Sequence, residues 1–187
     1  MRIEELKIKN FKSIASAEVY FAPLTMIVGA NASGKSNLIN VFRFISNIAT
    51  DGIDNSVALQ GGIPYLANAS LPKGTPIEIS FMLNLTKEGW IKSSNVKTVA
   101  LEIQNINYNF IIQPNLKGCG YHIASDNLSL DFSCLQINQA EKKGQRYTDL
   151  NTRVTFSFER KARKSTVSYN CTFDSEKKLD EKTRSQI

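Results

Sequence analysis

Apolar and polar positions follow two different periods along this chain, and the change of period separates predicted strands from a predicted helix. Two early strands are predicted where apolar residues recur at short spacing, first at Ile3, Leu6, Ile8 and Phe11 and then at Ala17, Val19 and Phe21. The apolar, β-branched run Leu24–Val28 predicts a third, buried strand. From Lys35 to Ile48 the chain has no Gly or Pro, and apolar residues recur at helical spacing at Leu38, Ile39, Phe42, Ile45 and Ile48. The opening segment, residues 1–50, therefore predicts strands followed by a helix.

The rest of the chain divides into three stretches by the same criterion. Residues 51–76 have no sustained period and are rich in Gly and Pro, which predicts a long irregular connection with at most one short helix. Residues 77–173 contain recurrent β-rich runs punctuated by Asn, Gly, Pro and Lys, which predicts an antiparallel meander. These runs are Ile77–Leu85, Thr98–Ile103, Tyr108–Gln113, Tyr121–Ala124, Leu128–Ile137, Arg153–Phe158 and Thr166–Phe173. Residues 174–187 form a polar tail.

The turn between the third predicted strand and the helix carries the strongest chemical signal. Gly29-Ala30-Asn31-Ala32-Ser33-Gly34-Lys35-Ser36 has the spacing G-x-x-x-x-G-K-[ST], which wraps backbone N–H groups around phosphate oxygens. Gly29 allows a sharp exit from the strand, and Gly34 lets the backbone approach the phosphates. Lys35 supplies a mobile positive charge for the β and γ phosphates, and the Ser36 hydroxyl is placed to ligate Mg²⁺. An ordinary strand-to-helix turn would explain neither the two glycines nor the Lys-Ser pair.

Composition and charge narrow the class of protein further. With 187 residues and 42% hydrophobic composition, the chain is long enough for one domain or one lobe of a larger domain. No run reaches the roughly 20 apolar residues of a membrane span, and three widely spaced cysteines form no disulfide framework, so a cytoplasmic location is expected. The formal net charge is +6, and its strongest basic cluster is Arg160, Lys161, Arg163 and Lys164. This cluster is a candidate nucleic-acid contact, although a solvated hairpin tip explains it more simply.

Two stretches together resemble a known family. Ile8-Lys9-Asn10-Phe11-Lys12-Ser13-Ile14 and the phosphate loop through Leu38 resemble the N-terminal lobe of ABC-type ATPases related to RecF, Rad50 and SMC proteins. Among these, the chain looks closest to bacterial OLD-type, Septu-like and retron-associated antiphage ATPases. The resemblance implies an α/β P-loop NTPase fold, with a mixed sheet and an antiparallel β subdomain. It also implies that the polar tail leads into a helical or coiled-coil segment and a second lobe.

The resemblance implies a set of residues that bind ATP and Mg²⁺. This set is Lys12, Ser13, Gly29, Asn31, Ala32, Ser33, Gly34, Lys35, Ser36 and Asn37, with Ser36 as the Mg²⁺ ligand. The chain departs from the family pattern because it has no apolar strand that ends in Asp-Glu and no convincing signature loop. Leu128–Phe132 and Cys171–Ser175 each lack the second carboxylate, and Leu59–Gly62 follows the phosphate loop too closely. No catalytic residue is therefore assigned within this chain.

These features predict an ATP-binding module that controls a larger assembly. ATP would draw two copies together, and hydrolysis, completed by a second lobe or subunit, would release them in antiphage defence or DNA transactions. The alternative is a non-hydrolysing module that binds nucleotide to stabilise a complex with a partner nuclease or toxin. A GTPase is disfavoured, because no Asn-Lys-x-Asp guanine-binding motif occurs in the chain.

Overall fold

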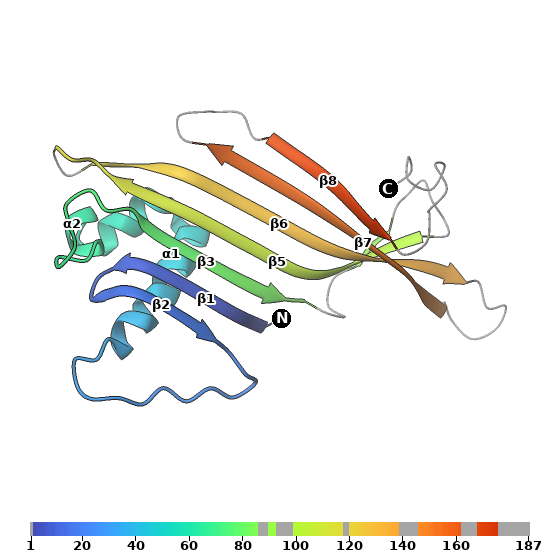
Figure 1. Ribbon diagram of the computed structural model, residues 1–187, viewed down its shortest axis with the longest axis horizontal. Coiled ribbons are helices and arrows are strands. Elements are labelled where there is room, and N and C mark those ends of the chain that lie inside the picture. The colour runs from blue at the N-terminus through green and yellow to red at the C-terminus, as the bar shows by residue number, and fades with distance from the viewer. Residues whose placement is uncertain are drawn as a thin grey trace.

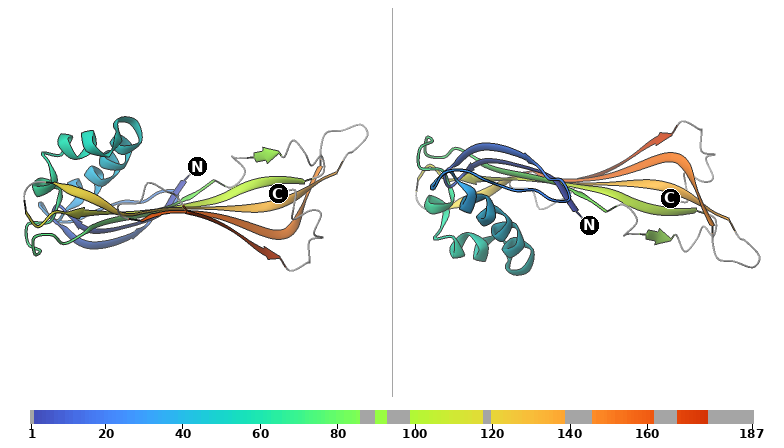
Figure 2. Two further views of the ribbon diagram at one scale, coloured as in Figure 1. Left: turned by 90° about the horizontal axis from the view of Figure 1, so that it is seen from above. Right: turned by 90° about the horizontal axis from the view of Figure 1, so that it is seen from below.

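A long, twisted sheet with helices over one half of one face makes up the structure (Figures 1 and 2). The computed structural model describes residues 2–85, 90–92, 99–117, 120–138, 146–161 and 168–175. In chain order the elements are β1 (Arg2–Phe11), β2 (Ile14–Tyr20), α1 (Lys35–Leu59), α2 (Ile63–Leu66), β3 (Ile77–Asn84), β4 (Trp90–Lys92), β5 (Val99–Pro114), β6 (Tyr121–Asn138), β7 (Arg146–Lys161) and β8 (Ser168–Ser175).

The described strands form one eight-stranded sheet in the order β2-β1-β3-β5-β6-β7-β8, with β4 paired to β5 outside this path. Each strand pairing among them is antiparallel. The predicted meander is confirmed, and it is continuous with the N-terminal strands because β3 pairs directly with β1. The two short strands predicted within residues 98–113 form one long strand, β5, and the two predicted within residues 121–137 form β6. Both strands continue through shifts in the register of their pairing. The predicted mixed sheet is wrong for the described residues.

The main hydrophobic core lies between α1 and the inner face of β1, β3 and β5. Residues of alternate positions along these strands are buried against the helix, which is the pattern of a sheet with one covered face. Phe11 of β1 and Phe44 of α1 are both fully buried, with ring centroids 5.8 Å apart. The other buried members of this cluster are Leu6, Ile8, Leu38, Val41, Val57, Ile63, Leu66, Ile77, Ile79, Phe110 and Ile112. The first two predicted strands and the predicted helix are thus confirmed.

A second, smaller cluster lies farther along β5, β6 and β7, beyond the part of the sheet that the helices cover (Figure 2). Phe132, Cys134 and Val154 are its buried members. Phe132 and Phe156 pack edge to face, with ring centroids 5.5 Å apart. Burial raises the pKa of the Cys134 thiol to about 11, so this cysteine stays protonated and acts as a small apolar side chain near neutral pH.

Helix α1 extends farther than its apolar spacing predicts. Gly52 has φ 81° and ψ 167°, which breaks the helical backbone, but the helix resumes and continues to Leu59. The resumed segment is held on both sides: Val57 is buried in the main core, and the Tyr121 hydroxyl of β6 donates to the Asp54 carboxylate. The predicted irregular connection from residue 51 therefore begins too early, because one glycine interrupts the helix without ending it.

The third predicted strand, Leu24–Val28, does not form. Residues 21–34 leave β2 at the edge of the sheet and reach α1 as a loop (Figure 1). The side chains of Leu24, Met26 and Val28 are 80%, 79% and 85% exposed. A buried strand needs neighbours that pair with its backbone and cover its side chains, and the described residues supply neither here. The predicted strand is wrong because an apolar run indicates only a preference for burial. It does not specify a neighbouring strand with which to pair.

We expect Phe44→Ala to lower the free energy of unfolding by about 3–5 kcal/mol, because it leaves a cavity against Phe11 in the main core. Met26→Ser, at an exposed position, is the control and should change this free energy by less than about 0.5 kcal/mol. Urea unfolding followed by circular dichroism measures both. A cost for Met26→Ser as large as that for Phe44→Ala would show that the loop is packed in solution.

Candidate functional site

The phosphate loop closes directly onto the start of α1. Gly34 takes the left-handed conformation, with φ 95° and ψ 1°, and α1 begins at the next residue, Lys35. Ala32 is also left-handed, with φ 63°. These two residues lie in the turn that leads directly into the N-terminus of the helix. Alanine adopts this conformation at a cost of roughly 1–2 kcal/mol, so the loop holds local backbone strain.

Helix α1 presents unsatisfied N–H groups to the loop. Its N-cap, Gly34, has no side chain to accept from them, and the first turn contains no acidic residue. The Gly34 carbonyl accepts hydrogen bonds from the Asn37 and Leu38 amides at 2.9 and 3.1 Å, which leaves the Lys35 and Ser36 amides without an intrahelical acceptor. A helix terminus with this polarity attracts an anion. The arrangement therefore fits phosphate.

Lys35 is folded onto the loop that precedes it. Its ammonium donates to the carbonyl oxygens of Gly29 and Ala30 at 2.7 and 2.6 Å, and contacts the Ser33 hydroxyl at 3.3 Å. A lysine flexible enough to make these contacts can transfer its hydrogen bonds to phosphate oxygens that enter the loop. Ser33 also lies over Gly29, since a Cβ on Gly29 would come within 2.9 Å of the Ser33 hydroxyl. A side chain at position 29 would therefore displace the Ser33 hydroxyl, whereas the predicted role of Gly29 at the exit of a strand does not apply because that strand does not form.

The turn between β1 and β2 forms a second wall beside the loop. The Asn37 side-chain amide of α1 donates to the Ser13 hydroxyl at 2.6 Å. A Cβ on Gly34 would lie 3.6 Å from the same hydroxyl, so Ser13 is in contact distance of the loop. Lys12, the neighbouring turn residue, has φ 49°. The resemblance implies that Ser13 and Asn37 belong to the nucleotide site, and the structure brings both residues to the predicted loop.

Not all predicted site residues acquire contacts of this kind. Asn31 and Ala32 lie at the exposed tip of the loop, and Ser36 is exposed in the first turn of α1. The Ser36 hydroxyl is therefore accessible to a Mg²⁺ ion that also binds phosphate oxygens. Among the described residues no group of three or more His, Cys, Asp or Glu side chains could hold a metal ion by itself. Any Mg²⁺ here would depend on the nucleotide for most of its ligands.

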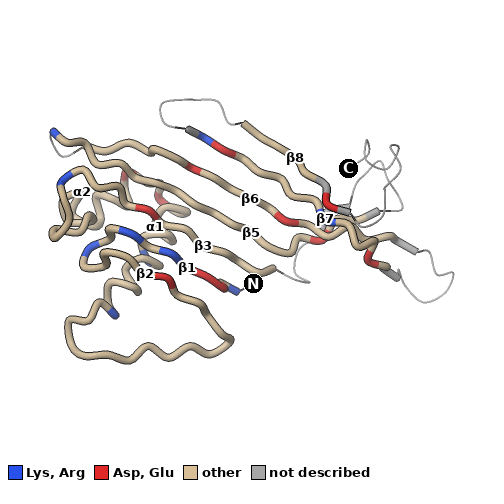
Figure 3. Tube along the Cα trace, in the orientation of Figure 1, with Lys and Arg blue, Asp and Glu red and all other residues tan. Residues whose placement is uncertain are grey.

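The candidate nucleic-acid cluster is only partly described. The Arg160 guanidinium pairs with the Asp126 carboxylate at 2.6 Å, so its charge is partly neutralised within the sheet. Lys161 is the last residue of β7, whereas Arg163 and Lys164 lie outside the described residues. Figure 3 shows basic and acidic positions interspersed along the described trace. Nucleic-acid contact through this cluster stays a prediction.

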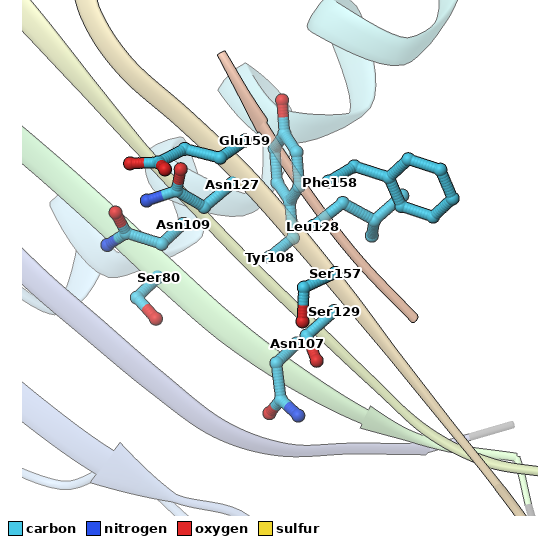
Figure 4. A pocket seen from close by; sticks show the side chains of 10 residues that line it. All are labelled: Ser80, Asn107, Tyr108, Asn109, Asn127, Leu128, Ser129, Ser157, Phe158 and Glu159. Atoms are coloured by element: carbon cyan, nitrogen blue, oxygen red, sulfur yellow. The ribbon is translucent and has the colours of Figure 1, made fainter. Parts of the chain in front are cut away.

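A shallow hollow of about 320 Å³ lies over β3, β5, β6 and β7, and both polar and apolar side chains line it (Figure 4). Asn107, Asn109 and Asn127 contribute their side chains to it, together with Glu159 and several serines. Asp131, which belongs to one of the weak candidates for an acidic strand, lies farther along β6 and accepts from Thr155 at 2.8 Å and Asn107 at 3.3 Å. Its carboxylate is thus engaged in cross-strand hydrogen bonds.

The loop, the helix N-terminus and the adjoining turn together form the candidate site, and its geometry and charge fit a phosphate group. The chain matches the family model described as "AAA ATPase domain" over residues 1–187, and it therefore belongs to this family. It is 51% identical over 47 residues to the DNA replication and repair protein RecF of Porphyromonas gingivalis, an alignment that covers 25% of this chain and 13% of that protein. It is 26% identical over 117 residues to the DNA replication and repair protein RecF of Acaryochloris marina, covering 60% of this chain and 31% of that protein.

These comparisons support a RecF- and SMC-like ATPase and so confirm the broad part of the resemblance. The chain spans less than a third of the length of the RecF proteins that it matches. No helix among the described residues combines the length and the hydropathy that a membrane crossing needs.

The left-handed conformation of Gly34 leads to a direct test. We expect Gly34→Ala to destabilise the protein by about 1–2 kcal/mol, because alanine is strained at φ 95° although its Cβ meets only ordinary contacts. Ala32→Gly is the matched change, and it should be neutral or stabilising because it relieves the same strain at φ 63°. Urea unfolding measures both, and equal stability of Gly34→Ala and the unmodified chain would contradict this loop geometry.

Proposed function

We propose that this chain binds Mg²⁺-ATP at the phosphate loop and that the bound nucleotide controls a larger assembly. The observation that carries the proposal is the position of Lys35, whose ammonium closes the loop over Gly29 and Ala30 at the N-terminus of α1. Two neutral carbonyl oxygens are weaker partners for an ammonium than a phosphate oxygen with a full negative charge. Phosphate would thus displace these contacts and leave the loop amides and Lys35 directed at the same anion.

Each of the other site residues has a defined task in this proposal. The backbone of residues 29–34, including Asn31, Ala32 and Ser33, surrounds the phosphates, and the Ser36 hydroxyl ligates the Mg²⁺ that accompanies ATP. Mg²⁺ would neutralise charge between the β and γ phosphates. Lys12 and Ser13 approach the nucleotide from the β1–β2 turn, while Asn37 holds Ser13 in place.

We further propose that Leu24–Val28 becomes a strand when a second lobe or subunit pairs with it. The exposure of its apolar side chains supports this idea, since pairing and coverage would remove that surface from water. Because this segment leads directly into Gly29, ordering it would also fix the start of the phosphate loop. ATP binding and assembly would thereby stabilise each other, as linkage requires.

Hydrolysis in this proposal depends on groups from the second lobe or subunit, with a second copy of the ATPase as the main partner. The RecF similarity supports a role in DNA transactions, and an antiphage role rests on the family resemblance alone. In the non-hydrolysing alternative, nucleotide instead stabilises a complex with a partner nuclease or toxin. Turnover that requires the complete ATPase would distinguish hydrolysis from this alternative.

We expect Lys35→Ala to weaken Mg²⁺-ATP binding by at least about tenfold, because it removes a charge-assisted contact to phosphate. Its stability should remain nearly unchanged, since the Lys35 ammonium makes only loop contacts. Lys9→Ala is the control, because this lysine pairs with Glu78 on the sheet, and it should bind ATP normally. Calorimetric titration with Mg²⁺-ATP, ADP and GTP measures these affinities. Unchanged ATP affinity in Lys35→Ala would overturn the assignment of Lys35.

A further inference from the structure

The end of β1 has an unusual backbone. Asn10 and Lys12 are both left-handed, with φ 58° and φ 49°, and the residue between them, Phe11, is fully buried. Asparagine tolerates this conformation better than most residues, whereas lysine has no such advantage. Strain of this kind persists only where the surroundings impose it, and it often accompanies a functional site. The contacts of Asn10 show what imposes it here.

Asn10 is 2% exposed, and both ends of its side-chain amide are engaged. Its nitrogen donates to the Thr75 and Pro76 carbonyls at 2.6 and 3.2 Å, and its oxygen accepts from the Asn68 amide at 2.9 Å. These partners define the orientation of the amide, because only nitrogen can donate to two carbonyls. Asn10 thus ties the end of β1 to two separate parts of the segment between α2 and β3.

The turn that follows Asn10 is held from both sides. On the side of α2, the Lys12 amide donates to the Leu66 carbonyl at 2.8 Å. On the side of α1, Ser13 accepts from Asn37 and lies against Gly34 of the phosphate loop. The backbone therefore runs from the anchored Asn10, through Phe11 and Lys12, to Ser13, which contacts the site that would hold phosphate.

We propose that Asn10 is a positioning residue of the nucleotide site, which holds Lys12 and Ser13 against the phosphate loop. This inference rests on the proposed function, because it concerns the affinity of the same site for Mg²⁺-ATP. Asn10 itself is buried among backbone groups and does not contact the nucleotide. It acts by maintaining the left-handed turn, and preorganising this turn reduces the conformational entropy that ATP binding would otherwise cost.

A double-mutant cycle tests this role by calorimetric titration of Mg²⁺-ATP. Asn10→Ala should lower the affinity on the order of tenfold when Lys12 and Ser13 are present. In the background of Lys12→Ala and Ser13→Ala together, Asn10→Ala should lower it no further, because the groups that it positions are gone. Asn10→Gly retains easy access to φ 58° and takes the place of Asn10→Ala if that variant does not fold.

Thr152→Val is the matched control, since Thr152 is also a fully buried polar residue but lies on β7. It should change stability without changing ATP affinity. Equal losses of affinity for the Asn10 variant in both backgrounds, or no loss in either, would overturn the positioning role. If the unmodified chain fails to bind ATP, or Lys35→Ala binds it equally well, the proposed function itself fails, and that result differs from either outcome for Asn10.

Discussion

The packing of α1 against the inner face of β1 is the contact on which the rest of the site depends. Phe44 and Phe11 form its centre, and both are fully buried. The helix carries Lys35 and Ser36 at its start, whereas the strand carries Lys12 and Ser13 just beyond its end. One apolar contact therefore positions two polar walls that come from different parts of the sequence. The hydrophobic core determines the geometry of the candidate site without contributing a polar group to it.

Polar side chains at and beside the loop between β2 and α1 have hydrogen-bond partners, but the apolar side chains of this loop are not buried. Lys35 finds partners within its own loop, and Ser13 finds one in Asn37. The apolar side chains of Leu24–Val28, by contrast, remain exposed at the edge of the sheet. An exposed apolar segment that joins a polar binding loop provides a physical link between ligand binding and association, because ordering either part restricts the other. The proposed switch depends on this link.

The sequence predicted most of the local structure correctly where one period dominated. Helical spacing identified the first turns of α1, mixed short spacing identified β1, and alternation identified β2. Recurrent β-rich runs identified the antiparallel meander. Prediction from the sequence failed where the limits or the pairing of an element depended on residues far away in the chain. The resumption of α1 after Gly52 depends on the core that receives Val57 and on the contact between Asp54 and Tyr121. The register shifts that keep β5 and β6 continuous likewise depend on their neighbouring strands. The apolar run Leu24–Val28 predicted a buried strand, but no described strand pairs with this segment.

The sequence by itself determined the chemistry of the phosphate loop. Two glycines, a lysine and a serine at the correct spacing specify a backbone that can approach an anion and the charge that neutralises it. Only the tertiary structure decided that the β1–β2 turn lies beside this loop, and that the Asn10 side chain bonds to the segment between α2 and β3. Asn10 and Thr75 are far apart in the chain, and no periodic pattern encodes a hydrogen bond between them. Local spacing specifies local conformation, whereas contacts between distant segments arise only when the core brings those segments together.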